Sequence, residues 1–304
     1  MTGFDVVVLG SLHLDVMVDA PALPRRGETA VGTGWGFKCG GKGGNQAIEA
    51  ARQGARTAMV GRVGDDDFGR RLLANLIAAG VDRAAVRVDA GAGSGMSVAI
   101  REAAGDYGAV IVSGVNLRLD GSDVAAATER LRPGGVLMLQ NEVPDAANVA
   151  AAAAASAKGA RVILNAAPAR ELPGPLGAQI EILLVNEIEA EMLAGTADPV
   201  EAAGRLAILN RVAIVTAGAA GLAVAGRGQR FELAGHRVQV ASTHGAGDAF
   251  AGALAARLAK GEPLRDAVAF ANAAAAAVVA TAEEARGSLG PEAAEALLRE
   301  AGRA

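Results

Sequence analysis

The sequence predicts a doubly wound α/β fold: a mostly parallel sheet flanked by helices, with a small antiparallel β lid. Three observations predict it. Short runs of β-branched and aliphatic residues recur along the chain, helical patterns separate these runs, and 51% of the 304 residues are hydrophobic, which is ample for a large core. Short apolar strands that alternate with helices are typical of a parallel sheet buried on both faces.

The elements follow one another in a regular order. We expect strands at Val6–Leu9, Thr57–Val60, Val136–Leu139, Val162–Leu164, Ile182–Val185 and Val212–Val215. Helical patterns fall at 44–53, 67–79, 145–157, 187–194, 199–209, 246–259, 264–281 and 291–302. Pro291 supports the start of the last helix, because proline is favoured at the first helical position. No internal repeat or low-complexity linker divides the chain, so we expect one domain over residues 1–304.

Two segments, 12–39 and 94–113, interrupt this order. They contain short β patterns and many turn residues, with no helix that could make a crossover; the patterns lie at Val16 and Val18, Ala30 and Val31, Ser97–Ile100, and Ala109–Val112. Such segments pair with one another as a small antiparallel sheet. We expect this sheet to form a lid over the carboxyl ends of the parallel strands, where α/β folds bind ligands.

The lid carries three aromatic residues, Trp35, Phe37 and Tyr107. They could stack on a nucleobase, which would favour a nucleoside substrate. More often such residues make the apolar contacts of the lid itself or of an interface between two lids. A homodimer formed through the lid is therefore expected.

Composition excludes several classes of function. Lys and Arg number 29 against 33 Asp and Glu, a net charge of −4, which offers no footprint for nucleic acid or an anionic membrane. The apolar stretches are shorter than the ~20 residues that a membrane helix needs. The single cysteine, Cys39, excludes an internal disulfide and a multi-cysteine metal site, and it is expected to be a small lid residue. These features favour the cytoplasm.

A glycine-rich stretch, Gly40–Ala47, leads into the first predicted helix. Its glycines let the backbone approach a ligand closely, and N–H groups at a helix start favour anionic or hydroxyl-rich ligands. Lys42 and Asn45 add side-chain donors. A P-loop is disfavoured, because Gly43 stands where a Ser or Thr should bind Mg²⁺. A glycine turn that merely caps a helix is the structural alternative.

A second stretch, Ser242–Phe250, leads into the helix at 246–259. Successive N–H groups at a glycine turn and helix start form a concavity that suits the charge of a phosphoryl group in transfer. Asp248 would point into the same space. Its structural alternative is an acidic residue that stabilises the first helical turn.

These stretches occur with two further motifs between them. Residues 165–173 read NAAPARELP, and Asn186 and Glu189 form an Asn-x-x-Glu pattern. With these four motifs in order, the chain resembles the ribokinase-like (PfkB) carbohydrate kinases from about residue 5 to residue 290. A dehydrogenase is disfavoured, because the turn at Gly10-Ser11-Leu12 does not continue as G-x-G-x-x-G.

The resemblance implies ATP-dependent phosphorylation of a sugar hydroxyl, with ribose favoured as the acceptor. Asp248 would be the general base, and the N–H groups of Gly245, Ala246 and Gly247 would form the anion hole. The sugar would be bound by His13, Asp15, Gly41, Lys42, Asn45 and Glu142. The nucleotide would be bound by Asn186, Thr216, Gly218, Gly221 and Asn272. Glu189 would organise Mg²⁺ through water, because Mg²⁺ tends to keep its hydration shell.

The chain departs from the family pattern at three positions. His13 replaces an asparagine and cannot reproduce amide geometry. It could contact a different polyol or a nucleobase, or simply pack under the lid. Ser242 replaces an aspartate that helps bind an activating monovalent cation, so Ser242 and His244 are weak candidates for that site and K⁺ dependence is in doubt. Ala166 replaces a proline.

The alternatives that remain open are a purine nucleoside kinase, another sugar kinase of the family, and a non-catalytic regulator that binds sugar or nucleotide.

Overall fold

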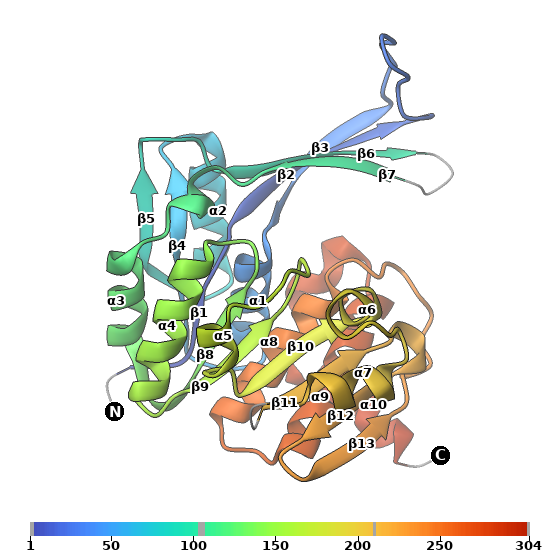
Figure 1. The fold of residues 1–304 in the computed structure, drawn as a ribbon. Coiled ribbons are helices and arrows are strands. Elements are labelled where there is room, and N and C mark those ends of the chain that lie inside the picture. The colour runs from blue at the N-terminus through green and yellow to red at the C-terminus, as the bar shows by residue number, and fades with distance from the viewer. Residues whose placement is uncertain (1–2, 103–106, 209–210, 303–304) are drawn as a thin grey trace.

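A nine-stranded sheet forms the centre of the molecule in a computed structural model that describes residues 3–102, 107–208 and 211–302 (Figure 1). Its strand order is β13-β12-β11-β10-β9-β8-β1-β4-β5. The paired neighbours from β5 to β11 run parallel, and β12 and β13 add an antiparallel edge. The strands are β1 (Phe4–Leu9), β4 (Thr57–Gly64), β5 (Asp82–Asp89), β8 (Leu131–Gln140), β9 (Arg161–Asn165), β10 (Ile182–Asn186), β11 (Val212–Thr216), β12 (Leu222–Gly226) and β13 (Gln229–Leu233).

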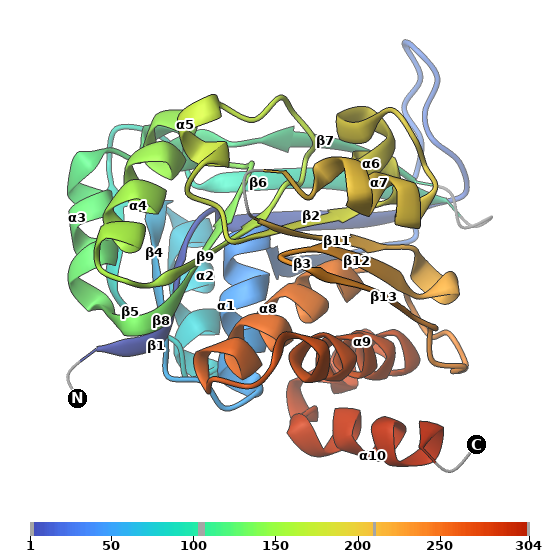
Figure 2. The same ribbon diagram turned by 60° about the horizontal axis from the view of Figure 1, so that its bottom comes forward.

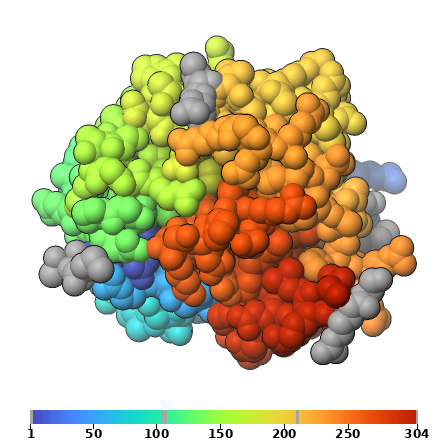
Figure 3. Space-filling model, turned by 90° about the horizontal axis from the view of Figure 1, so that it is seen from below, coloured from blue at the N-terminus to red at the C-terminus, as the bar shows by residue number. Residues whose placement is uncertain are grey.

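Helices cover both faces of this sheet (Figure 2). One layer consists of α1 (Lys42–Arg52), α2 (Asp67–Ala78), α8 (Ala246–Ala259) and α9 (Leu264–Ala280), and α10 (Pro291–Ala301) packs on the outside of α9. The other consists of α3 (Gly121–Arg130), α4 (Asp145–Ala157), α5 (Gly174–Gly177), α6 (Glu187–Ala194) and α7 (Pro199–Leu206). In the space-filling view from below, the orange and red residues of the last third of the chain cover much of the visible face (Figure 3).

The apolar residues of a central strand divide between two cores. Val6 and Val8 of β1 belong to one hydrophobic cluster, and Val7 and Leu9 belong to the other. Side chains alternate between the faces of a strand, so a continuous apolar run requires cover on both sides. The predicted doubly wound fold is confirmed on this basis.

The helices α1 and α8 pack closely enough for their side chains to meet at the ligand-binding end of the sheet. A Cβ atom added to Gly252 of α8 would lie 2.7 Å from the backbone oxygen of Gln46 in α1. Only a glycine at this position allows the two backbones to come so near. The first turns of the two helices are thereby brought side by side.

A four-stranded sheet projects from the body as a lid (Figure 1). It contains β2 (His13–Ala20), β3 (Gly34–Gly40), β6 (Gly95–Glu102) and β7 (Tyr107–Val112), in the order β3-β2-β6-β7. Its two outer pairs are antiparallel, as expected, but the central pair of β2 and β6 is parallel. The chain passes through β3, α1, β4, α2 and β5 between these two strands, and this path brings β6 back in the direction of β2.

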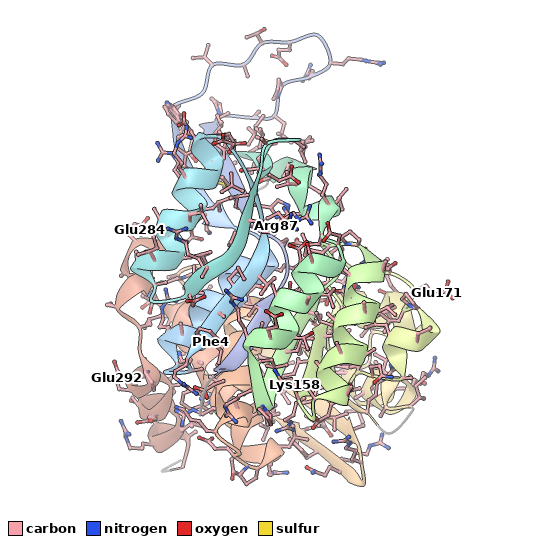
Figure 4. All side chains as sticks on the ribbon, turned by 90° about the vertical axis from the view of Figure 1, so that its left-hand side faces the viewer. Phe4, Arg87, Lys158, Glu171, Glu284 and Glu292 are labelled. Atoms are coloured by element: carbon pink, nitrogen blue, oxygen red, sulfur yellow. The ribbon has the colours of Figure 1, made fainter. Side chains whose placement is uncertain are left out.

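The connection between β2 and β3 does not follow the predicted β pattern. Ala30 and Val31 lie in an irregular, exposed segment rather than in a strand. This segment stands away from the body in the side view (Figure 4). The registers of the lid strands do not include Ala30 or Val31.

Among the described strands and α-helices, five were not predicted from the sequence: β5, α3, α5, β12 and β13. The strand β5 lies at an edge of the sheet and carries charged residues at both ends, so it lacks a long apolar run. Part of the predicted lid, residues 103–106, and the last residue of the predicted helix 199–209 lie outside the described residues. Among the helices that the structure describes, none has the length and apolar character needed to cross a membrane.

Candidate active site

A cleft of about 1140 Å³ lies between the lid and the carboxyl ends of the parallel strands. It is lined by residues from both sheets and from the first turns of α1, α6 and α8. The structure brings most of the predicted site residues together here: His13, Asp15, Gly41, Lys42, Asn45, Glu142, Asn186, Glu189, Thr216, Ser242, His244, Gly245, Gly247 and Asp248. Four predicted residues are not among those that line it: Gly218, Gly221, Ala246 and Asn272.

Asp248 is held in the first turn of α8 by two amide side chains of α1. The Nδ2 atom of Asn45 donates to Oδ2 at 2.9 Å, and the Nε2 atom of Gln46 donates to Oδ1 at 2.9 Å. Both carboxylate oxygens are therefore fixed by donors from one helix. This arrangement orients the carboxylate within the cleft.

Burial raises the pKa of Asp248 above its usual range. The charge of Lys42 and the hydrogen bonds from Asn45 and Gln46 act in the opposite direction, because they stabilise the carboxylate, while the charge of Glu142 adds to the rise. A carboxylate in a cleft with opposing influences of this kind is a candidate for acid–base chemistry.

The side-chain amide of Gln46 is itself held by a second glutamine. Gln140, at the end of β8, donates from Nε2 to Oε1 of Gln46 at 2.8 Å. Both glutamines are fully buried. The sequence analysis did not single out either residue, although Gln46 lies within the glycine-rich stretch. Gln140 gave no local signal, because its partner is 94 positions away in the chain.

The start of α8 has the features expected of an anion-binding turn. Gly245 is the N-terminal cap residue with φ 80°, a left-handed conformation that favours glycine, and no side chain caps the helix. A Cβ atom added to Gly247 would meet nothing within 4 Å. The N–H of Ala246 donates to the carbonyl of Thr243 at 3.3 Å, so this donor is partly engaged within the turn.

Glu142 follows the end of β8 and contacts the glycine-rich stretch. Its Oε2 atom accepts hydrogen bonds from the hydroxyl of Ser11 and from the N–H of Lys42, the latter at 2.9 Å. His13 is 5% exposed, and its Nδ1 atom lies 3.8 Å from the same oxygen. The Nε2 atom of His13 is buried and has no hydrogen-bond partner among the described residues.

Asp15 lies inside the lid strand β2 and not at the carboxyl end of a strand of the main sheet. Its Oδ1 atom accepts a hydrogen bond from the hydroxyl of Ser97 on β6 at 2.5 Å. The register β2–β6 pairs these two residues directly. Asp15 therefore reaches the cleft from the lid, whereas Glu142 reaches it from the body.

The glycine-rich stretch serves chain packing as well as the cleft. Gly41 has φ 85°, and a Cβ atom there would lie 2.7 Å from the backbone nitrogen of His13. A Cβ atom at Gly43 would lie 2.7 Å from the backbone nitrogen of Ser11. These glycines allow the start of α1 to cross the segment between β1 and β2 at backbone contact distance.

Asn186 and Glu189 form a capping box at the start of α6. The N–H of Glu189 donates to Oδ1 of Asn186, and the N–H of Asn186 donates to Oε2 of Glu189, each at 2.9 Å. Burial raises the pKa of Glu189, and the charge of Lys42 opposes that rise. Both residues therefore cap α6, and Oε1 of Glu189 is the carboxylate oxygen outside the box.

The remaining predicted nucleotide residues have separate environments. Thr216, at the end of β11, donates to the carbonyl of Val185 at 3.4 Å and lines the cleft. Gly218 is exposed in a short 3₁₀ turn (η2, Gly218–Ala220). Gly221 is buried with φ 106°, and a Cβ there would meet the Leu233 carbonyl at 2.0 Å. Asn272 of α9 donates to the Ala234 carbonyl at 2.8 Å.

The lid aromatics pack against one another and against the body. The rings of Trp35 and Phe37 meet edge to face at 5.3 Å, and Phe37 meets Phe68 of α2 at 5.8 Å. The side chain of Tyr107 lies outside the described residues. Cys39 is partly buried, and burial raises the pKa of its thiol.

The chain is similar to known carbohydrate kinases along most of its length. The model for the pfkB family carbohydrate kinases matches residues 4–288. A ribokinase of Bacillus subtilis is 33% identical over 271 residues, covering 89% of this chain and 91% of the relative. A ribokinase of Haemophilus influenzae is 31% identical over 277 residues, covering 89% and 90%. A deoxyribokinase of Salmonella typhi is 33% identical over 259 residues, covering 83% and 84%.

Solved structures agree with this assignment. The Arabidopsis thaliana ribokinase complexed with ribose and ATP superposes with a TM-score of 0.89 at 29% identity, over 98% of this chain and 99% of that one. A ribokinase of Thermotoga maritima superposes with a TM-score of 0.87 at 26% identity, over 97% and 99%. With its fold, its cleft and these relatives taken together, the chain belongs to the pfkB family of carbohydrate kinases and is a sugar phosphotransferase.

Proposed function

We propose that this sugar kinase transfers the γ-phosphoryl group of ATP to a hydroxyl of ribose, giving ribose 5-phosphate. The observation that carries the proposal is the Asp248 carboxylate, held by Asn45 and Gln46 at the start of α8, beside N–H groups that no side chain caps. A general base next to an anion hole is a sufficient set for phosphoryl transfer, in which positioning and electrostatics dominate.

In the proposed reaction, Asp248 accepts the proton of the attacking hydroxyl. That oxygen forms a bond to the γ-phosphorus as the bond to the bridging β–γ oxygen breaks, and ADP leaves. The N–H groups of Gly245, Ala246 and Gly247 stabilise the charge that spreads over the phosphoryl oxygens. Ala246 would have to exchange its long contact with Thr243 for the phosphoryl group.

The nucleotide is proposed to be ATP with Mg²⁺. A related ribokinase structure contains ATP, and the cleft here places Asn186, Glu189 and Thr216 on the body side. The donor set fits Mg²⁺ that is held mainly by phosphates and water, since Glu189 retains one carboxylate oxygen outside its capping box. When bound, the ion would neutralise phosphate charge. Gly218, Gly221 and Asn272 remain predicted nucleotide residues.

The sugar is proposed to lie between the lid and the body, bound by Asp15, Lys42, Asn45 and Glu142, with the backbone at Gly41 beside it. Carboxylates reach it from both sheets, and paired acceptors of this kind suit vicinal hydroxyls. The relatives include ribokinases and a deoxyribokinase, so acceptance of the 2-deoxy sugar is a real alternative. Among the proposed sugar-binding residues, His13, buried beside Glu142, departs from the family pattern.

A purine nucleoside kinase has less support. Strand register places Phe37 opposite Val16 and Trp35 opposite Val18, whereas Asp15 pairs with Lys38. Trp35 and Phe37 are among the residues that line the cleft. Side chains alternate along a strand, however, so the two aromatic side chains extend from the face of the lid opposite to Asp15. Their contacts with each other and with Phe68 favour a packing role over stacking on a base.

A homodimer through the lid is also part of the proposal. Together Trp35, Phe37, Val98, Val110 and Val112 form an apolar patch, which we term the outer lid face, with Trp35 70% exposed and Val110 69% exposed. Their strand registers place them on one side of the sheet. An exposed apolar sheet face of this kind is typical of an interaction surface, and a second copy of the chain is the proposed occupant.

The Asp248→Asn variant tests the proposed base. We expect kcat to fall by about two to four orders of magnitude, the range usual for loss of a general base, with the Kd values for ATP and sugar little changed. Steady-state kinetics and calorimetric binding provide the measurement, with ribose, 2-deoxyribose, fructose and purine nucleosides as acceptors. Near-normal turnover in the variant would remove Asp248 from this role, and preference for another acceptor would replace ribose.

A further inference from the structure

Arg286 binds three backbone carbonyl oxygens next to the cleft. It lies in a 3₁₀ turn (η3, Glu283–Ser288) that follows α9. Its Nη1 atom donates to the carbonyl of His244 at 2.7 Å, its Nη2 atom to that of Ser242 at 2.9 Å, and its Nε atom to that of Thr281 at 3.0 Å. The guanidinium group therefore occupies the point on which the three oxygens converge.

These contacts join the end of one helix to the start of another. Thr281 is the residue at which α9 ends, where carbonyl groups carry partial negative charge. Ser242 and His244 belong to the segment that leads into α8, and a Cβ atom added to Gly245 would lie 4.0 Å from Nη1 of Arg286. The positive charge thus lies beside the anion-binding turn, on the carbonyl groups of the segment that precedes Asp248.

Convergent carbonyl oxygens are also the ligands that K⁺ prefers in proteins. The family resemblance implies a monovalent cation in this region, and the residues present do not fit one. The carbonyls of Ser242 and His244 already accept from Arg286, and the hydroxyl of Ser242 donates to Oε1 of Glu283 at 3.1 Å. A second cation at these oxygens would be repelled by the guanidinium charge.

We infer that Arg286 is a positioning residue that supplies the cation of the Ser242–Gly247 segment from within the chain, so that phosphoryl transfer needs no added monovalent cation. The inference rests on the proposed function, because the segment matters for catalysis only if it binds the transferred group. A planar guanidinium with five donors can hold several carbonyl groups in a fixed geometry, which a hydrated point charge does less well.

The unmodified enzyme gives the first test. Initial rates with saturating ATP, Mg²⁺ and sugar are measured in KCl, NaCl and tetramethylammonium chloride at equal ionic strength. We expect kcat to agree within about twofold across the three salts, because Arg286 already engages the carbonyl groups. Activation of about tenfold or more by K⁺ would overturn the inference, since an ion bound by carbonyl groups would then be required.

The Arg286→Ala variant gives the second test. Displacement of the anion-binding turn should lower kcat in tetramethylammonium chloride by about ten- to a hundredfold, with a smaller effect on the KM for sugar. Millimolar guanidinium ion, or K⁺, should restore part of the rate, because either can bind the freed carbonyl groups. Loss of activity that neither ion restores in folded protein would assign Arg286 a purely structural role and overturn the inference.

Two further variants separate folding from positioning. Arg205→Ala removes an arginine that donates to the carbonyl of Ala194 on α6, at a site that does not line the cleft, and kcat should stay unchanged. Arg286→Lys retains a charge without the planar fork, so it should fold and show an intermediate kcat. If Arg286→Ala fails to fold, equal kcat for Arg286→Lys and the parent would overturn the inference.

The outcomes for this inference and for the proposed function remain distinct. An unmodified enzyme that phosphorylates no acceptor contradicts the proposed function. An active enzyme that requires K⁺ leaves that function intact and contradicts only the role of Arg286.

Discussion

The hydrogen bond from Gln46 favours the ionised form of Asp248, which is the form that can accept a proton. Burial and the charge of Glu142 raise the pKa of this carboxyl group, whereas Lys42, Asn45 and Gln46 favour its ionised form. Gln46 donates to Oδ1 of Asp248, and its own amide oxygen accepts a hydrogen bond from Gln140, which fixes the orientation of the Gln46 side chain. A general base works only when ionised, so these contacts bear on the pH range of activity.

Replacement of Gln46 by methionine should move the acid limb of the pH profile to higher pH. The substitution removes a donor to the carboxylate, so the pKa of Asp248 rises further and the base is lost earlier as pH falls. The kcat/KM values of Gln46→Met should approach those of the parent most closely above neutral pH. Profiles of kcat/KM against pH, measured with the same sugar, check the direction of the shift.

A matched substitution on the same helix serves as the control. Gln53 is 2% exposed at the end of α1 and donates from Nε2 to Glu49 rather than to Asp248. The Gln53→Met variant should lose stability in urea unfolding yet keep the parental acid limb. An unshifted limb in Gln46→Met, or an equal shift in both variants, would contradict the assigned role of Gln46.

At the scale of elements, one ion pair ties the lid to the body across the cleft. Lys38 of β3 meets Glu283 of η3 at 2.7 Å, and Glu283 also accepts the hydrogen bond from Ser242. The lid and the segment before α8 are thereby linked through a single carboxylate. The Lys38 and Glu283 side chains are 29% and 37% exposed, so the pair is solvated and its contribution is modest.

The Lys38→Met variant should loosen the lid without altering the base. Loss of an exposed ion pair worth up to about 1 kcal/mol should raise the KM for sugar by about two- to fivefold, with a smaller change in kcat. The difference from the parent should shrink in high salt, which screens the pair. Hydrogen exchange of the β3 amides should also become faster.

An ion pair elsewhere on the surface provides the comparison for the lid. Arg70 and Asp67 of α2 meet at 2.5 Å and are both exposed, and neither lines the cleft. Arg70→Met should leave the KM for sugar and the exchange of β3 unchanged. A KM for Lys38→Met that matches the parent at low salt would show that the pair does not hold the lid.

At the scale of the whole molecule, the outer lid face predicts self-association. Its aromatic and aliphatic side chains remain exposed in the isolated chain, and burial of such a face would stabilise a dimer. Sedimentation velocity of the parent should give the mass of a dimer at micromolar concentration. Val110→Asp would place a charge in the interface and should shift the population towards monomer.

A similarly exposed valine distinguishes interface from general surface effects. Val88 of β5 is 56% exposed and lies outside the lid, so Val88→Asp should leave the sedimentation of the dimer unchanged. A parent that sediments as a monomer at all concentrations would contradict the proposed dimer.

The sequence was sufficient to predict the central strands and most helices, because apolar periodicity is a local property. It was less informative at the edges: β5, β12 and β13 lie at or beside sheet edges. There, solvent and partner strands decide the structure more than apolar content does. The parallel pairing of β2 with β6 also escaped prediction, because it depends on where the chain returns after the excursion through β5.

By itself the sequence determined which residue types could gather in the cleft: a helix-start aspartate, two glycine turns, and further carboxylates. Tertiary structure alone decided that Gln46 reaches Asp248, 202 positions away, and that Gln140 supports Gln46. It also decided that Arg286 meets the carbonyl groups of Ser242 and His244. The physical reason is that a motif records short-range backbone requirements, whereas these hydrogen bonds exist only after separate helices and turns have packed together.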